Sequence, residues 1–381
     1  MPLAVLAGAI ANKPRNGGEA WVRLNWLLGL RRLGWDVLFV ERVTGPVDRE
    51  GRLHLEAAMA EHGLGDCWAL LDERGAGVAG VPRDEVDALS AEAKVLFNHS
   101  GHLPPGPLRD APRSSVYVDL DPAFTQLWDA DPGVSFSVGG HDRHVTVGLA
   151  VGSGDCRLPA GGVDWIPTPP PVVLNRWPQA PAPTGGPFRF TTVATWRSPY
   201  GELSVDGRIA GGKHHEFRRM MDLPGRVEEA DFELALDIHP GDATDLDALR
   251  GAGWTVVSPA EVAATPAAFA AYVRGSGAEF SVAQGAYAVS RCGWFSDRTA
   301  AYLASGRPAL VQDTGIGTAL PVGEGLLPFA DLAGAEEAAR RLLADQAGHA
   351  DAAGDLARTY LDSDLVLGNL LERLGLGSLV S

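Results

Sequence analysis

The chain has 381 residues, of which 45% are hydrophobic and 21% are charged. This composition is that of a globular protein, and the length favours two domains. The formal net charge of −16 argues against nucleic acid and anionic membrane surfaces as partners, because both attract clustered cations.

The three cysteines are too few and too widely spaced for a disulfide framework or a C-x-x-C metal pair. No apolar run approaches the ~20 residues that a membrane span needs. We therefore expect a cytoplasmic protein without a membrane span. The composition, rich in Ala, Gly and Arg and poor in Lys, favours a bacterial source, and the sequence leaves the oligomeric state open.

The N-terminal half alternates between strands and helices. Residues 2–11 are continuously apolar, as in a strand buried on both faces of a parallel sheet. A polar loop, a helix over 19–33 and a second strand at 36–43 follow, which is the β-loop-α-β unit of a doubly wound α/β fold. Further on we predict a helix near 53–73 and strands at 94–102, 114–121 and 144–152.

Eight prolines lie between Pro167 and Pro187. Proline lacks the backbone donor and fixes φ, so this stretch predicts a semi-rigid connection between domains. We place an N-terminal Rossmann-like domain at 1–175, the linker at 176–187 and a second Rossmann-like domain at 188–350. A C-terminal helix in 351–381 is expected to cross back to the first domain.

The same alternation resumes after the linker. Strands are predicted at 188–196, 231–238, 254–258, 278–284 and 308–313. Helices are predicted near 214–222, at 243–251, 260–274 and 296–305, and through 334–374.

The loop after the first strand carries Gly17 and Gly18 directly ahead of a helix. Glycines there let backbone N–H groups approach a phosphate at the positive end of the helix, although by themselves they are better explained by a tight turn. The spacing is not G-x-G-x-x-G, which disfavours a dinucleotide oxidoreductase even though Glu41 ends the second strand. The string GGEAWVRLNWLLGLRRLGWDVLFVE resembles the first βαβ unit of GT-B glycosyltransferases.

A second resemblance lies in CGWFSDRTAAYLASGRPALVQDTG, residues 292–315. It is similar to the donor-binding core of GT-B C-terminal domains. The resemblance implies that Ser296, Asp297 and the turn Gln312, Asp313, Thr314 and Gly315 bind the nucleotide sugar. Helix capping alone accounts for Ser296 and Asp297. Retaining members carry a glutamate where this chain has Ala301, which weakens the retaining interpretation.

Cations are needed to neutralise the departing nucleoside diphosphate at a metal-free site. Similar enzymes place an Arg and a Lys after the first strand of the second domain. Arg197, Arg208 and Lys213 occupy that region here, and Lys213 is the first choice because glycines precede it. A solvated surface loop is the alternative explanation.

The general base of an inverting enzyme is commonly a His or Asp of the N-terminal domain. His99, at the end of strand 94–98, and Asp119, at the end of the next strand, are the predicted catalytic residues. The string Asp119-Leu120-Asp121 also matches the D-x-D metal motif of the other glycosyltransferase architecture. That architecture is one continuous domain, so the linker favours a site without metal.

The resemblance therefore implies a GT-B fold of two domains facing a cleft, and transfer of a sugar from a nucleoside diphosphate sugar to an unidentified acceptor. No cofactor beyond that co-substrate is expected. The composition, typical of a GC-rich bacterial genome, agrees with natural-product or cell-envelope glycosylation. The alternatives are a non-catalytic sugar-nucleotide-binding protein, a sugar-nucleotide epimerase, a dinucleotide oxidoreductase and an interaction protein.

Overall fold

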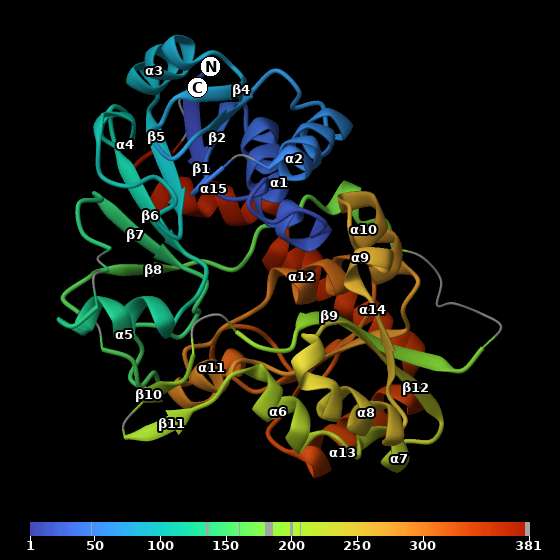
Figure 1. The fold of residues 1–381 in the computed structure, drawn as a ribbon. Helices are drawn as coiled ribbons and strands as arrows, with labels where there is room; N and C mark the ends of the chain where they lie inside the picture. The colour runs from blue at the N-terminus through green and yellow to red at the C-terminus, as the bar shows by residue number, and fades with distance from the viewer. Residues whose placement is uncertain are drawn as a thin grey trace.

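The computed structural model describes residues 1–46, 48–134, 136, 138–159, 161–179, 186–198, 201–205 and 207–377. Two parallel sheets, each flanked by helices, form the molecule (Figure 1). The chain passes from the first sheet to the second through the proline-rich segment, of which residues 180–185 lie outside the described part. The predicted α/β class is confirmed.

The first sheet has eight strands in the order β4-β3-β2-β1-β5-β6-β7-β8, all parallel except the β3–β4 pair. Its strands are β1 (Leu3–Ala7), β2 (Asp36–Arg42), β3 (Trp68–Leu71), β4 (Gly77–Gly80), β5 (Val95–His99), β6 (Ser115–Asp119), β7 (Arg143–Thr146) and β8 (Trp165–Pro167). The helices between them are α1 (Gly17–Arg32), α2 (Arg49–Glu61), α3 (Arg83–Glu92), α4 (Pro107–Asp110) and α5 (Phe124–Ala130).

The second sheet has six parallel strands in the order β13-β12-β9-β14-β15-β16. They are β9 (Phe188–Thr195), β12 (Ala230–Asp237), β13 (Thr255–Val257), β14 (Ala278–Ser281), β15 (Ala309–Gln312) and β16 (Leu326–Phe329). A separate antiparallel hairpin pairs β10 (Leu203–Val205) with β11 (Arg208–Ala210).

The helices of the second half flank that sheet, except the last, α15, which packs on α1 of the first half. They are α6 (Lys213–Arg219), α7 (Leu223–Arg226), α8 (Ala243–Gly251), α9 (Pro259–Val262), α10 (Pro266–Arg274), α11 (Gly285–Ser290), α12 (Asp297–Ala304), α13 (Leu332–Ala344), α14 (Gln346–Leu356) and α15 (Ser363–Arg373), with a π-helical turn at Ala357–Leu361. No helix in the described residues is long and apolar enough to cross a membrane.

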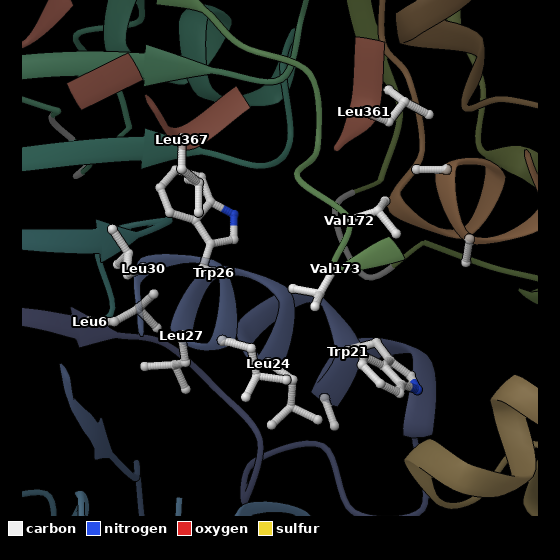
Figure 2. Packing of buried hydrophobic residues seen from close by; sticks show 14 of the residues in the cluster. Leu6, Trp21, Leu24, Trp26, Leu27, Leu30, Val172, Val173, Leu361 and Leu367 are labelled. Atoms are coloured by element: carbon white, nitrogen blue, oxygen red, sulfur yellow. The ribbon is translucent and has the colours of Figure 1, made fainter. Parts of the chain in front are cut away.

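Helix α1 is buried around almost its whole circumference, and its side chains fill the core between the first sheet and the helices behind it (Figure 2). Trp26 is fully buried, and its ring lies against Phe97 of β5. At its N-terminal end, the indole N–H of Trp21 donates to the carbonyl of Pro266 in α10 at 2.9 Å. One helix therefore packs in both halves of the molecule.

The proline-rich segment and the C-terminal helix also pack on α1. The backbone N–H of Val173 donates to the Asn25 side chain at 3.1 Å, and Val172 forms a parallel bridge with Asp362. Helix α15 lies along α1, where Gly29 allows close approach of Ser363 and Leu367 (Figure 1). The last helix of the described chain thus lies beside the first.

Three predicted helical stretches differ from the structure, and one of them, 334–374, is divided into α13, α14, the π-helical turn and α15. The expected helix over 53–73 ends at Glu61, and Trp68–Leu71 form β3 beside β2, because a short apolar run does not distinguish a buried strand from a helix. The expected helix 260–274 is divided into α9 and α10, since Pro266 lacks the N–H that would continue the hydrogen-bond ladder. The expected strand 144–152 ends at Thr146.

We expect Gly29→Ala to lower the free energy of unfolding by about 1–3 kcal/mol, the usual cost of overpacking a core. A Cβ at this position would lie 2.6 Å from Leu367 Cδ1 and 2.9 Å from Ser363 Cβ. Gly368→Ala, in α15 with no neighbour within 4 Å, is the matched control and should stabilise by about 1 kcal/mol. Urea denaturation of both variants tests this, and equal stabilisation by both would contradict the packing.

Candidate functional site

Loops at the carboxyl ends of the strands in one half contact the equivalent loops of the other half. The phenol O–H of Tyr287 in α11, just after β14, donates to Asp121, just after β6, at 3.2 Å. The segment after β7 pairs with the segment ahead of α12, through the bonds from Leu149 N to Gly293 O and from Ala150 N to Cys292 O. In open α/β sheets ligands bind at such strand ends.

A pocket opens at the carboxyl ends of β14 and β15. Its polar lining comes from Ser281, Ser296, Thr299 and Gln312, and its apolar lining includes Trp294 and Ile316. Trp294 pairs through its backbone with Gly148 of the first half. The pocket therefore lies beside the junction of the two halves.

Lys213 begins α6 and is half-buried at this junction. Burial, and then the Arg298 charge, lower the pKa of its ammonium to about 7, while Glu279 and Asp121 act in the opposite direction. Among the described residues, no carboxylate forms an ion pair with Lys213. The neighbouring Arg298 is fully engaged, since it pairs with Glu279 at 2.6 Å and donates to Val193 O and Ser281. Lys213 is thus an available cation.

Two half-buried carboxylates lie at the same junction. Burial raises the pKa of Asp121 to about 6, and the nearby Asp119 and Glu19 contribute in the same direction. Burial also raises the pKa of Asp297, at the start of α12, to about 6, and Arg23 opposes this shift. No ion pair involving either aspartate is found in the described part of the chain. Both therefore carry incompletely compensated charge near neutral pH.

The first half contributes a further charged group on α1. Arg23 pairs with Glu19 at 2.5 Å, and its side chain is only 5% exposed. His102 lies nearby, and burial together with the Arg23 charge lowers its pKa to about 4. Its imidazole is therefore neutral at physiological pH.

Gly17 and Gly18, predicted to bind phosphate, lie at the contact with α9 and α10. Gly17 N–H donates to Ala263 O at 2.9 Å, and a Cβ on Gly17 would lie 2.1 Å from Thr265 O. A Cβ on Gly18 would meet the Phe269 ring at 3.1 Å. Close approach of the other half accounts for both glycines, and their binding of phosphate stays a prediction.

The two predicted catalytic residues are fully buried. His99 lies edge-on to Trp26, and its burial lowers the imidazole pKa well below the usual value. Asp119 accepts hydrogen bonds from Thr125, Gln126, Thr146 and the backbone of Asp121, at 2.6–3.0 Å. These bonds hold the segment that follows β6. The structure therefore gives Asp119 a positioning role beside Asp121, which sequence reasoning mentioned but did not select.

The three predicted diphosphate-binding cations differ in exposure and in partners. Arg197 is 53% exposed, is paired with Asp242, and lies 3.4 Å from the ring of His214, the residue after Lys213. Arg208 is exposed on β11. Lys213 is half-buried and lies within electrostatic range of Asp121 of the other half. Spacing along the sequence did not distinguish them, because the three residues lie on different elements whose directions only the fold determines.

The predicted nucleotide-sugar residues lie together, but most of their polar atoms already have partners. Ser296 caps α12 by accepting from Arg298 N at 3.2 Å, and Asp297 lies in the first turn. In the turn after β15, Asp313 forms an ion pair with Arg291 at 3.2 Å and accepts a hydrogen bond from the backbone N–H of Gly315. Gly315 has a φ of 88°. Thr314 donates to Trp294 O at 2.8 Å.

Gln312 bridges two elements, since it accepts from Ala283 N and donates to Glu216. Ser296 and Gln312 line the pocket described above, whereas Asp313 and Gly315 line a separate, open pocket beside β16. Ala301, at the position where similar retaining enzymes carry glutamate, is 3% exposed in the hydrophobic core. A glutamate carboxylate at that position would be buried among apolar side chains.

Glu41, the acidic residue that a dinucleotide site would use, is fully buried. Its carboxylate accepts the backbone N–H groups of Ile10, Ala11 and Asn12, each at 2.7 Å. It thereby shapes the loop after β1 and has no exposed oxygen for a ribose. Among the described residues, no three His, Cys, Asp or Glu side chains are grouped so as to hold a metal ion, and metal independence stays a prediction.

No protein-family profile matches the sequence, and no curated protein matches it either. Solved structures match over nearly the whole chain. AviGT4, a glycosyltransferase involved in avilamycin A biosynthesis, is 14% identical, with a TM-score of 0.57 over 98% of this chain and 97% of its own. HepE of Anabaena, in complex with UDP and glucose, is 12% identical, with a TM-score of 0.61 over 98% and 100%.

The chain has a GT-B-like fold. This confirms the architecture that the resemblance implied. A putative UDP-N-acetylglucosamine 2-epimerase from Listeria monocytogenes is also similar, at 13% identity and a TM-score of 0.50 over 99% of this chain and 97% of its own. At these identities the similarity defines the fold and leaves the reaction to be argued from the site.

We expect Asp121→Asn to stabilise the protein at pH 8 and to have little effect near pH 4. A carboxyl whose pKa is raised in the folded state, here from 3.8 to about 6, contributes stability below its unfolded pKa and loses it as pH rises through the folded value. At about 1.4 kcal/mol per pH unit, and allowing for partial solvent access, the gain at pH 8 should be about 1–3 kcal/mol.

Chemical denaturation of wild type and Asp121→Asn across this pH range measures the effect. Asp247→Asn, on the exposed side of α8, is the control and should give the same difference from wild type at every pH. A difference for Asp121→Asn that does not change with pH would show that Asp121 is not in the environment described.

Proposed function

We propose that the chain is a glycosyltransferase that moves a sugar from a nucleoside diphosphate sugar to an acceptor bound on the N-terminal side of the junction. The observation that carries this proposal is the half-buried, unpaired Lys213 close to Asp121 of the other half. The GT-B-like fold, and the UDP in the HepE structure that shares it, support a nucleotide donor. The likeness to AviGT4 supports a role in natural-product biosynthesis.

The donor diphosphate is assigned to Lys213. Negative charge develops on the nucleoside diphosphate as it leaves, and a fixed ammonium in a partly desolvated site stabilises that charge more than an exposed one does. The pocket at the ends of β14 and β15 has a volume of only about 10 Å³, about what one water molecule needs, so the nucleoside and the sugar are not assigned to it. No metal is part of this proposal.

Asp121 is assigned as the general base in place of His99 and Asp119. A catalytic base works best with a pKa near the operating pH, and the pKa of Asp121 is raised to about 6. The hydrogen bond from Tyr287 fixes the carboxylate at the junction. Transfer of the acceptor hydroxyl proton to Asp121 fits an inverting reaction, which agrees with Ala301 in place of the glutamate of retaining enzymes.

A sugar-nucleotide epimerase is the second candidate, favoured by one observation. Glu19, Asp121 and Asp297 bring three carboxylates to the junction, and an epimerase requires acidic groups around its sugar. Incubation with UDP-N-acetylglucosamine alone separates the two functions. An epimerase forms the 2-epimer without any acceptor, whereas a transferase leaves the sugar configuration unchanged.

Calorimetric titration with UDP, GDP, ADP and dTDP tests the donor assignment. We expect one of these nucleotides to bind, and release of labelled sugar from the corresponding nucleotide sugar then tests turnover. Absence of binding by all four would remove both the transferase and the sugar-nucleotide-binding interpretations.

Lys213→Ala should weaken binding of that nucleoside diphosphate about 10- to 100-fold, since a hydrogen bond to a charged group contributes about 1.5–3 kcal/mol. In the wild type, affinity should fall as pH rises above about 7, up to tenfold per pH unit, because the ammonium with a pKa of about 7 must be protonated to bind the anion. Lys213→Arg should remove this pH dependence, since guanidinium stays charged.

Lys94→Ala is the matched control. Lys94 directly precedes β5 and so lies at the amino end of that strand, whereas the junction lies at the carboxyl ends. Removal of its ammonium should change neither the nucleotide affinity nor the pH dependence of that affinity. Equal affinity of wild type and Lys213→Ala at pH 6.5 would show that another cation binds the diphosphate.

A further inference from the structure

The first turn of α6, which carries Lys213, is fixed by contacts from neighbouring loops. Gly285 N–H donates to Gly211 O, and Lys213 N–H donates to the Gln284 side chain, both at 3.0 Å. A Cβ on Gly285 would lie 2.7 Å from Gly211 O, so this approach needs glycine. The loop after β14 therefore holds the backbone around Lys213.

Gln312 adds a contact one turn further along the same helix. It is the last residue of β15 and is 5% exposed. Its Nε2 donates to Glu216 Oε2 at 2.7 Å, while its Oε1 accepts from Ala283 N at 3.0 Å. A single buried amide thus connects β15, the loop after β14 and the helix that begins with Lys213.

We propose that Gln312 is a positioning residue that sets the place of Lys213 by holding Glu216 of α6 against the end of β15. This inference rests on the proposed function, in which Lys213 binds the donor diphosphate. It differs from the role that the family resemblance implies for Gln312, which is direct contact with the nucleotide sugar. A glutamine is needed because one side chain must accept from a backbone N–H and donate to a carboxylate.

Exchange of the Gln312 amide and the Glu216 carboxylate between the two positions tests the proposal. Gln312→Glu places a carboxylate against Glu216 and removes the donor, so α6 should shift. The double variant Gln312→Glu/Glu216→Gln restores the hydrogen bond in the opposite direction, and the carboxylate introduced by Gln312→Glu still accepts from Ala283 N. Glu216 also pairs with Arg219, which is 59% exposed, so loss of that pair should matter little.

The probe is whichever of UDP, GDP, ADP and dTDP binds the wild type most tightly, and its dissociation constant is measured across pH. The proteins compared are wild type, Gln312→Glu, Glu216→Gln, the double variant and Lys213→Ala. We expect Gln312→Glu to weaken binding at least tenfold and to change the pH at which affinity begins to fall, while the double variant returns within about threefold of wild type. A purely structural role would lower the melting temperature without altering the pH profile.

The outcomes are distinguishable. Unchanged affinity in Gln312→Glu, with weakened binding in Lys213→Ala, overturns the positioning role alone. Weakened binding in Gln312→Glu that the double variant fails to restore also overturns it, and indicates direct contact of Gln312 with the ligand, since a carboxylate repels phosphate and donates no hydrogen bond. Unchanged affinity in Lys213→Ala, or no binding of any nucleotide to the wild type, overturns the proposed function and the positioning role with it.

Discussion

The arrangement of the two halves depends on the packing of α1. Its central part is buried beneath the first sheet. Its first two turns donate hydrogen bonds to Ala263 and Pro266 of the second half, and its last turns lie against α15. Each contact needs a particular residue: glycine at 17 and 29 for close approach, and tryptophan at 21 for a buried N–H donor. Because α1 begins just after β1, the same contacts bring the strand ends of the first sheet to the second half.

The junction formed in this way keeps charged groups in unfavourable surroundings. The pKa values of Asp121 and Asp297 are raised and that of Lys213 is lowered, so each group is destabilised in its charged form by burial. Other buried charges of the protein are paired, as in Arg298 with Glu279, or accept several hydrogen bonds, as in Asp119 and Glu41. Incomplete compensation of this kind is typical of a binding or catalytic site.

Several polar residues near the junction act by holding others. Asp119 orders the segment that carries Asp121, Glu41 shapes the loop after β1, and Thr314 fixes the backbone of Trp294. Residue type and position at a strand end could not separate these roles from ligand contact, since both use the same donors and acceptors. Only the partners of each atom show which groups remain available.

The sequence alone determined the alternating α/β order, because hydrophobic periodicity acts locally along the chain. The GT-B architecture was implied by the resemblance of two segments to known glycosyltransferases, and the domain bounds near the prolines stay a prediction. The sequence also predicted Lys213 as a cation in a glycine-rich loop and the 312–315 turn as a polar group at a strand end. The identity of the short run 68–71 as a strand, the burial of His99 under Trp26 and the pairing of Arg197 with Asp242 were decided by tertiary structure. These features depend on residues distant in sequence, and burial and charge compensation exist only once those residues meet.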